Sequence, residues 1–256
     1  MLENGRRYGS RCTQIIELEP VYTFMPETPT FSPYRDLTTF ERCDALARAK
    51  VREQTMVQLR YMDDYRRSAL ELFLKAIAAA EGVVAPSPDG GYRRALVAHF
   101  LQGATHVHRA IVEGAYAKSA AILKHDMELL CRIEEVKAGT QKEGQQPQFR
   151  AAPYLGRMNG HLNDLAHPSK EDLIHLSLEE RVADGKRGIS PFPVYEPKFA
   201  KSLFSVHAYL SLQASREAID LLVNTKGQTD PKFVELVDEW NALQARGVTE
   251  GVFLEG

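Results

Sequence analysis

Residues 156–172, GRMNGHLNDLAHPSKED, contain the side-chain types that acid–base chemistry uses. Drawn as a helix at about 100° per residue, the apolar residues gather on one side and the opposite side is polar. The polar side consists of Gly156, Gly160, Asn163, Asp164 and His167, with Arg157 beside it. An imidazole, a carboxylate and an arginine on adjacent turns could perform acid–base work on a phosphate ester. The candidate catalytic residues are Arg157, His161, Asp164 and His167.

Two other interpretations of this face stay open. It could face water, with His167 at the helix C-terminus, where the helix dipole favours a positive imidazole. It could instead contact another helix or a second subunit, with Asn163 and His167 hydrogen-bonding across the contact. Gly156 and Gly160 lie four residues apart and leave a notch in which another backbone or a ligand could come close.

A second polar stripe lies further towards the N-terminus, at spacings of three and four residues: His99, Gln102, His106, Arg109 and Glu113. Arg109 and Glu113 form an i, i+4 pair, which is commonly a solvated salt bridge. The functional alternative is that the stripe meets the polar face of 156–167 inside a helical bundle. The candidate ligand or interface residues are Arg109, Glu113, His106, Asn163, Gly156 and Gly160.

Other chemistries lack their motifs. The sequence has no Glu-x-x-His pair and no HExxH, so no metal site is predicted. The segment SPDGGYRR at 87–94 lacks the spacing and the Lys-Ser/Thr of a phosphate-binding loop, and no GxSxG motif occurs. We therefore expect neither a metal nor another cofactor.

The elements that would position these residues are helical. Loops rich in Gly, Pro and polar residues separate long segments whose apolar residues recur at three- and four-residue spacing. This pattern predicts an all-α bundle in which two long antiparallel helices carry shorter ones across them, and no strand. The long helices are expected at 35–81 and at 92–138, the latter with a bend at Gly103 or Gly114.

The shorter helices are expected at 150–166, 169–182, 198–224 and 230–246. His167 should end the first of them, because the residue before Pro168 is driven out of the α region. Ser169 should start the next helix, and Asp230 with Pro231 should start the last one. Residues 1–33 alternate apolar and polar residues between prolines, which predicts an extended arm. The expected organisation is this arm, one domain at 34–247 and a tail at 248–256.

Composition restricts the class of protein further. The 256 residues are 44% hydrophobic, with 32 basic and 34 acidic residues, so no charge excess indicates nucleic acid or a membrane surface as partner. The three cysteines form no CxxC pair, which favours a reducing compartment. No segment approaches the roughly 20 apolar residues of a membrane span. We expect a cytoplasmic protein.

The run HRAIVEGAYAKSAAILKHDMELLCRIEE, followed by a helix that ends in LNDLAHPS, resembles bacterial all-α proteins near the HEPN superfamily over about residues 92–225. Active members of that superfamily are often dimeric RNA-cutting proteins of toxin or antiphage systems. They carry an Arg, a polar residue and then a His four to six residues beyond the Arg. Here Met158 follows Arg157, and only three residues separate Arg157 from His161; Arg94 and His99 have the spacing but lack the polar residue.

The resemblance therefore implies a non-catalytic binding or assembly module of HEPN-like type, acting as a homodimer. The alternative is a metal-independent ribonuclease that uses the polar face around His161 and His167. RNA or a nucleotide as partner would need a local basic site, because the net charge is −2.

Overall fold

The computed structural model describes residues 36–80, 87–149, 153–167, 179–181, 187–226 and 230–253. Within these residues the chain is an all-α bundle, as the sequence predicts, and the predicted arm at 1–33 lies outside them. The helices are α1 (Leu37–Ala79), α2 (Pro88–Val112), α3 (Tyr116–Lys137), α4 (Pro153–Ala166), α6 (Pro197–Lys226) and α7 (Pro231–Thr249).

Local stereochemistry explains where several helices begin. The carboxylate of Asp36 accepts a hydrogen bond from the Thr39 amide at 2.8 Å and caps α1. Ser87 caps α2 through the Gly90 amide at 3.2 Å. Asp230 caps α7 and Pro231 occupies its first turn, which confirms the predicted start of that helix. The predicted end of α4 is also confirmed, because Ala166 is its last residue and His167 is non-helical.

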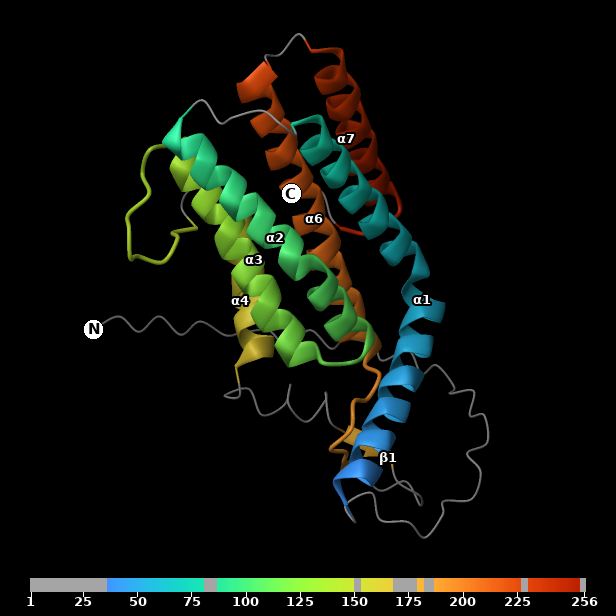
Figure 1. Cartoon of the computed structure of the whole chain (residues 1–256). Helices are drawn as coiled ribbons and strands as arrows, with labels where there is room; N and C mark the ends of the chain where they lie inside the picture. Colours follow the sequence, from blue (N-terminus) through green and yellow to red (C-terminus); the bar gives the residue numbers. More distant parts are fainter. Residues whose placement is uncertain are drawn as a thin grey trace, which may run out of the picture.

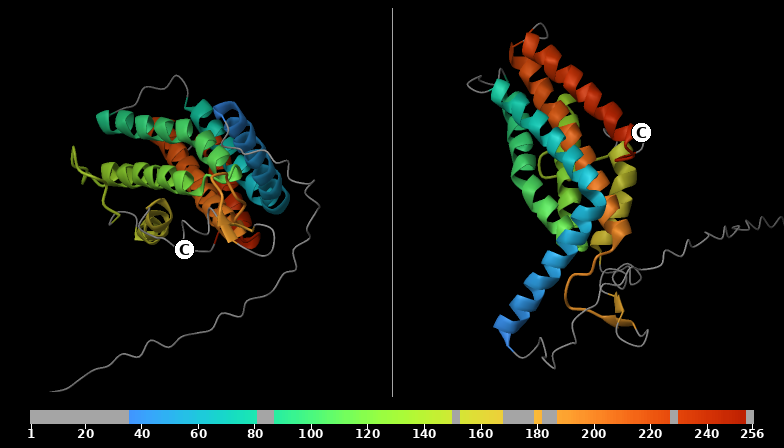
Figure 2. Two further views of the ribbon diagram at one scale, coloured as in Figure 1. Left: turned by 90° about the horizontal axis from the view of Figure 1, so that it is seen from below. Right: turned by 90° about the vertical axis from the view of Figure 1, so that its right-hand side faces the viewer.

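Successive helices alternate in direction, so that α1, α3 and α6 run one way and α2, α4 and α7 the other (Figures 1 and 2). The two longest helices, α1 and α6, lie side by side and run in the same direction. The sequence predicted a bundle built on two long antiparallel helices. That part of the prediction is wrong, because the two longest helices are parallel. Antiparallel packing occurs between neighbours in sequence, which short loops favour.

The expected helix at 92–138 is also corrected, since Glu113, Gly114 and Ala115 separate α2 from α3. Gly114 has φ 77°, in the left-handed region that glycine adopts without a steric penalty. The amide of Ala115 donates to the Ala110 carbonyl at 2.8 Å, which closes the last turn of α2. Gly114 thus breaks the segment into an antiparallel helical hairpin instead of bending one helix.

The sequence predicted no strand and a helix that extends to residue 182, and both predictions are wrong at 179–189. Two short strands, β1 (Glu179–Arg181) and β2 (Arg187–Ile189), pair antiparallel, with Glu179 opposite Ile189. The connection between the two strands, residues 182–186, lies outside the described residues. The predicted helix start at Ser169 lies outside the described residues.

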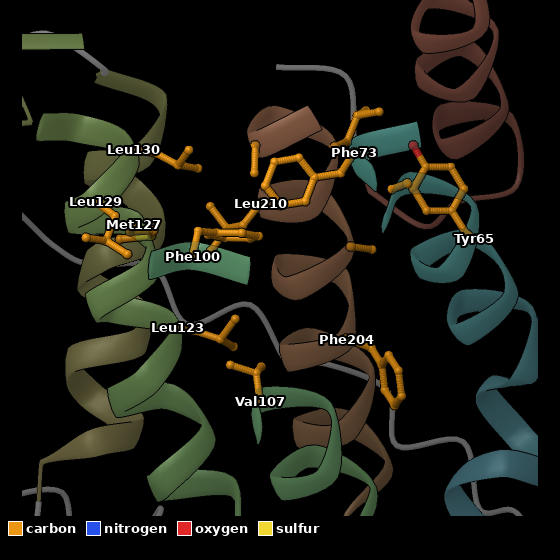
Figure 3. Close-up of a cluster of buried hydrophobic side chains, with 14 of the residues drawn as sticks. Tyr65, Phe73, Phe100, Val107, Leu123, Met127, Leu129, Leu130, Phe204 and Leu210 are labelled. Atoms are coloured by element: carbon orange, nitrogen blue, oxygen red, sulfur yellow. The ribbon is translucent and has the colours of Figure 1, made fainter. Parts of the chain in front are cut away.

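The core lies between α1, α2, α3 and α6. Phe73 of α1 and Phe100 of α2 pack edge to face, with ring centroids 6.1 Å apart, close to Leu210 of α6 and Met127 of α3 (Figure 3). Burial of these large side chains is the main stabilising contribution to such a bundle. Among the described residues, none of the helices has a stretch apolar and long enough to cross a membrane.

The C-terminal residues up to 253 belong to this packing. Helix α7 runs three residues beyond its predicted end, to Thr249, and Val252 is buried. The ring of Phe253 lies edge-on to Tyr65, with centroids 5.5 Å apart. Gly247 leaves the space that this ring needs, because a Cβ there would lie 2.4 Å from Phe253 Cζ.

Candidate functional site

Helix α4 carries most of the predicted catalytic residues, and its apolar side packs on α3. Leu155 and Leu162 are buried, as expected of the core face. On the other side, His161, Asp164 and His167 are exposed, and Asn163 is half-buried. The side chain of Arg157 lies outside the described residues. The arrangement places these groups on one side of a single helix.

The two glycines of α4 differ in their surroundings. A Cβ at Gly160 would meet nothing within 4 Å, and one at Gly156 would lie 3.6 Å from Phe149 Cβ. Among the residues that the structure describes, no backbone therefore enters the predicted notch at Gly160. Contact with a second copy at this place stays a prediction.

The second polar stripe does not meet α4 in this chain, because α3 lies between α2 and α4 (Figure 2). His99, Gln102, His106 and Arg109 are exposed on α2, and the ring of His99 packs against His125 of α3 at 5.2 Å. Glu113 is buried, so it does not share the solvent face of its stripe. The expected pocket between the stripe and α4 is thus wrong within one chain.

Glu113 lies instead among arginines of two helices. Its Oε1 accepts from Arg109 Nε at 3.0 Å and from Arg52 Nη2, and its Oε2 lies 3.9 Å from Arg48 Nη1. Burial alone would raise the pKa of this carboxyl group, but the hydrogen bonds from Arg109 and Arg52 outweigh burial and lower it. We call Glu113, Arg48, Arg52 and Arg109 the Glu113 cluster.

Sequence reasoning found Arg109 and Glu113 and missed the two arginines of α1. Arg48 and Arg52 lie one turn apart and flank the buried Val51. That spacing is a signal for a shared helix face. Nothing in the local pattern relates this face to Glu113, which lies 61 residues beyond Arg52.

A second buried polar cluster joins α1, α2 and α6. Asp63 Oδ1 accepts from Arg66 Nε and Nη2 at 2.9 and 2.7 Å and lies 3.0 Å from His108 Nε2. Asp63 Oδ2 accepts from Arg67 Nε at 3.0 Å. Nearby, His207 is fully buried on α6, and burial lowers its pKa to about 3, so it stays neutral at physiological pH. Asp63, Arg66 and His207 of this cluster are buried, whereas Arg67 is exposed on the surface of α1.

A third group of charges lies where α2 begins and α3 and α6 end. Glu217 accepts from Arg93 Nη2 at 3.1 Å and also from Lys137 Nζ. A cavity of about 350 Å³ opens there, lined by Arg93, Lys137, Asp220 and Val223. Lys137 Nζ lies 3.4 Å from Asp220 Oδ2, so the basic groups of this cavity are already paired with acids.

The outward side of α1 carries a different surface. Leu46 is 64% exposed and Val57 is 78% exposed, and the exposed Lys50 and Glu53 lie between them on the same face. On the opposite side of the helix, Val51, Thr55 and Leu59 are buried in the bundle. We call Leu46, Lys50, Glu53 and Val57 the α1 outer face.

Comparison with protein-family models, with curated proteins and with solved structures finds no match to this chain. Function must therefore be argued from the geometry. Among the described residues, no three His, Cys, Asp or Glu side chains are placed to hold a metal ion. The Glu113 cluster and the α1 outer face remain as the surfaces whose chemistry points to a binding partner.

Proposed function

We propose that this protein is an assembly module that forms a symmetric homodimer through the α1 outer face. The observation that carries the proposal is the pair of exposed apolar side chains, Leu46 and Val57, with a base and an acid between them. Leu46 and Val57 lie three turns apart, about 16 Å along the helix, so the proposal rests on the pattern of the face and not on one continuous apolar patch. Here the face is also complementary to itself.

The complementarity appears when two copies of α1 pack antiparallel about a twofold axis midway between Lys50 and Glu53. Leu46 then faces Val57 of the second copy, and Lys50 faces Glu53. The axis generates each contact twice, as an isologous interface requires. Both apolar residues find an apolar partner, and both charges find an opposite charge.

The spacing fits such a pair of helices. Positions 46, 50, 53 and 57 are separated by four, three and four residues, the spacing of the core positions of a coiled coil. They lie in the part of α1 before Leu59, where φ −119° and ψ 20° interrupt the helical geometry. The contact would therefore use one regular helical segment.

A second copy can reach this segment. The first half of α1 extends beyond the ends of the neighbouring helices, whereas its second half is surrounded by the bundle (Figures 1 and 2). Phe192 and Tyr195 contact its inner side, through Phe40 at 5.2 Å and Gln58 at 2.9 Å. No described residue covers the outer side at Leu46 and Val57, which are 64% and 78% exposed.

Energetics predict a weak, reversible dimer. Full burial of a leucine or valine contributes about 1.5–3 kcal/mol, and four such side chains must offset an association cost of about 4–15 kcal/mol. The Lys50–Glu53 ion pairs between the two copies fix how the helices align more than they add to the affinity. The most favourable balance of these terms, about 8 kcal/mol, corresponds to a dissociation constant of about 1 µM. Incomplete burial makes the contact weaker than this limit, so we expect a dissociation constant on the order of 10 µM or above.

The proposed kinship with HEPN-like proteins, whose active members are often dimers, agrees with an assembly role. The ribonuclease alternative has less support. General acid–base catalysis needs groups converging on a substrate, whereas His161, Asp164 and His167 lie exposed along one side of α4.

Leu46→Glu and Val57→Glu each place a charge opposite an apolar partner, so we expect either variant to abolish dimerisation. Sedimentation equilibrium over about 10–500 µM protein, a range that brackets the expected constant, measures it. Val234→Glu is the matched control, since Val234 is 51% exposed on α7, away from the face. Circular dichroism should show all three variants folded. A wild-type protein that stays monomeric throughout, or dimers that survive both α1 substitutions, would refute the proposal.

A further inference from the structure

The Glu113 cluster holds more positive charge than its acids neutralise. Three guanidinium groups surround Glu113, and among the described residues one other carboxylate contacts the cluster, Asp44, which accepts from Arg48 Nε at 2.7 Å. The site therefore keeps an excess of positive charge in a protein whose net charge is −2. That local excess favours an anionic ligand.

The exposure of each charged side chain in the Glu113 cluster decides where an anion would bind. The side chain of Glu113 is 7% exposed, whereas those of Arg52 and Arg109 are 52% and 75% exposed. The carboxylate thus lies beneath and the guanidinium groups lie above it, towards solvent. Glu113 holds two arginines from different helices side by side without occupying their outer edges.

The number of N–H donors on Arg52 and Arg109 that Glu113 leaves unused supports anion binding above the carboxylate. A guanidinium carries five N–H groups. The described contacts of Glu113 use one nitrogen of Arg52, Nη2, and one of Arg109, Nε. The remaining N–H groups belong to side chains that are more than half exposed. Paired guanidinium donors match the oxygens of a phosphate group better than a lysine would.

We propose that the Glu113 cluster is a binding site for a phosphate monoester on a small molecule, held by Arg52 and Arg109 with Arg48 in support. The compactness of the cluster favours a single dianionic group over a polyanion such as RNA, which would use a longer track of basic side chains. The proposal does not rest on the dimer, because Arg48 and Arg52 lie away from the α1 outer face.

The test uses the full chain and two matched ligands, glycerol 3-phosphate and glycerol, with inorganic phosphate as a third probe. Calorimetric titration should show saturable binding of both phosphates and none of glycerol. Arg52→Gln and Arg109→Gln should each weaken binding about 10-fold or more, the usual effect of losing a charge-assisted pair. Arg67→Gln is the control, since Arg67 is 63% exposed on the same helix but bonds to Asp63, and it should leave binding unchanged.

Three results would overturn the site: no saturation by either phosphate at about 10 mM, beyond useful affinity; equal losses in Arg67→Gln and Arg109→Gln; or tighter binding of an RNA oligonucleotide without terminal phosphate. Circular dichroism of each variant shows whether it is folded. If Arg109→Gln does not fold, Arg52→Gln gives the same comparison.

Discussion

Asp63 and Asp126 are both aspartates buried between helices, yet their surroundings shift their pKa values in opposite directions. For Asp63, burial would raise the pKa, but His108 and Arg66 outweigh burial and hold the pKa well below its usual range. Asp126 faces Gly103, where a Cβ would lie 3.4 Å from its Oδ1, and its Oδ2 has no hydrogen-bond partner among the described residues. Burial therefore raises the pKa of Asp126 to about 7.

The raised pKa makes Asp126 a source of pH-dependent stability. Below the unfolded-state pKa of 3.8, both states keep the proton. As pH rises from 3.8 to about 7, the unfolded chain ionises and the folded chain does not, so the free energy of unfolding falls.

Asp126→Asn removes this titration while keeping the shape of the side chain. We expect the variant to be more stable than wild type at pH 8, by up to about 4 kcal/mol, and to differ little at pH 4. Urea unfolding at both pH values measures the difference. Equal pH dependence in the two proteins would show that Asp126 ionises freely in the fold.

The identities of neighbouring residues predicted where helices end better than they predicted where a long helical segment is interrupted. Asp230 with Pro231 and His167 before Pro168 mark boundaries that depend on adjacent residues alone. The break at Gly114 also depends on a distant segment, since Pro193 and Val194 pack against it. The apolar period continues across 113–115, and therefore the sequence suggested one helix.

The same limit explains the candidate site. Arg109 and Glu113 are recognisable as a pair because they lie one turn apart. Arg48 and Arg52 join them through the packing of α1 on α2, which no local spacing encodes. The exposed position of Gly160 likewise depends on which side of α4 meets α3.

Gly114→Ala tests the interruption, with Gly139→Ala as the matched control. Both glycines follow the C-cap of a helix with positive φ, 77° and 64°. A left-handed alanine costs about 1–2 kcal/mol at either place. At Gly114 the added Cβ would also lie 3.1 Å from both Pro193 Cβ and Val51 Cγ1, whereas at Gly139 it meets nothing within 4 Å.

We therefore expect Gly114→Ala to lose at least about 1 kcal/mol more stability than Gly139→Ala, the usual cost of overpacking. Thermal or urea unfolding of both variants measures the difference. Equal losses would mean that the junction yields to the extra methyl group and does not fix the α2–α3 hairpin.

In the whole molecule, the two halves of α1 lie in different surroundings. Its second half supplies Tyr65 and Phe73 to the core, and its first half presents Leu46 and Val57 to solvent. A helix that contributes to the core and also extends beyond it can join two bundles without changing either. The dimer proposal follows from that division.

The charge pair within the α1 outer face gives the most direct test of the dimer. Lys50→Glu would place two acids opposite each other across the twofold axis, and Glu53→Lys would place two bases opposite each other. Each contact occurs twice, so we expect either substitution to weaken dimerisation at least about 10-fold. Lys50 and Glu53 are both exposed, so neither substitution should unfold the chain.

The decisive measurement is the dimer dissociation constant of the double variant, Lys50→Glu with Glu53→Lys, by sedimentation equilibrium beside the wild type and the two single variants. The exchange restores opposite charges across the axis, so we expect the double variant to recover a constant close to that of wild type. A double variant as weak as the single variants, or single variants that dimerise like wild type, would contradict the antiparallel α1 dimer.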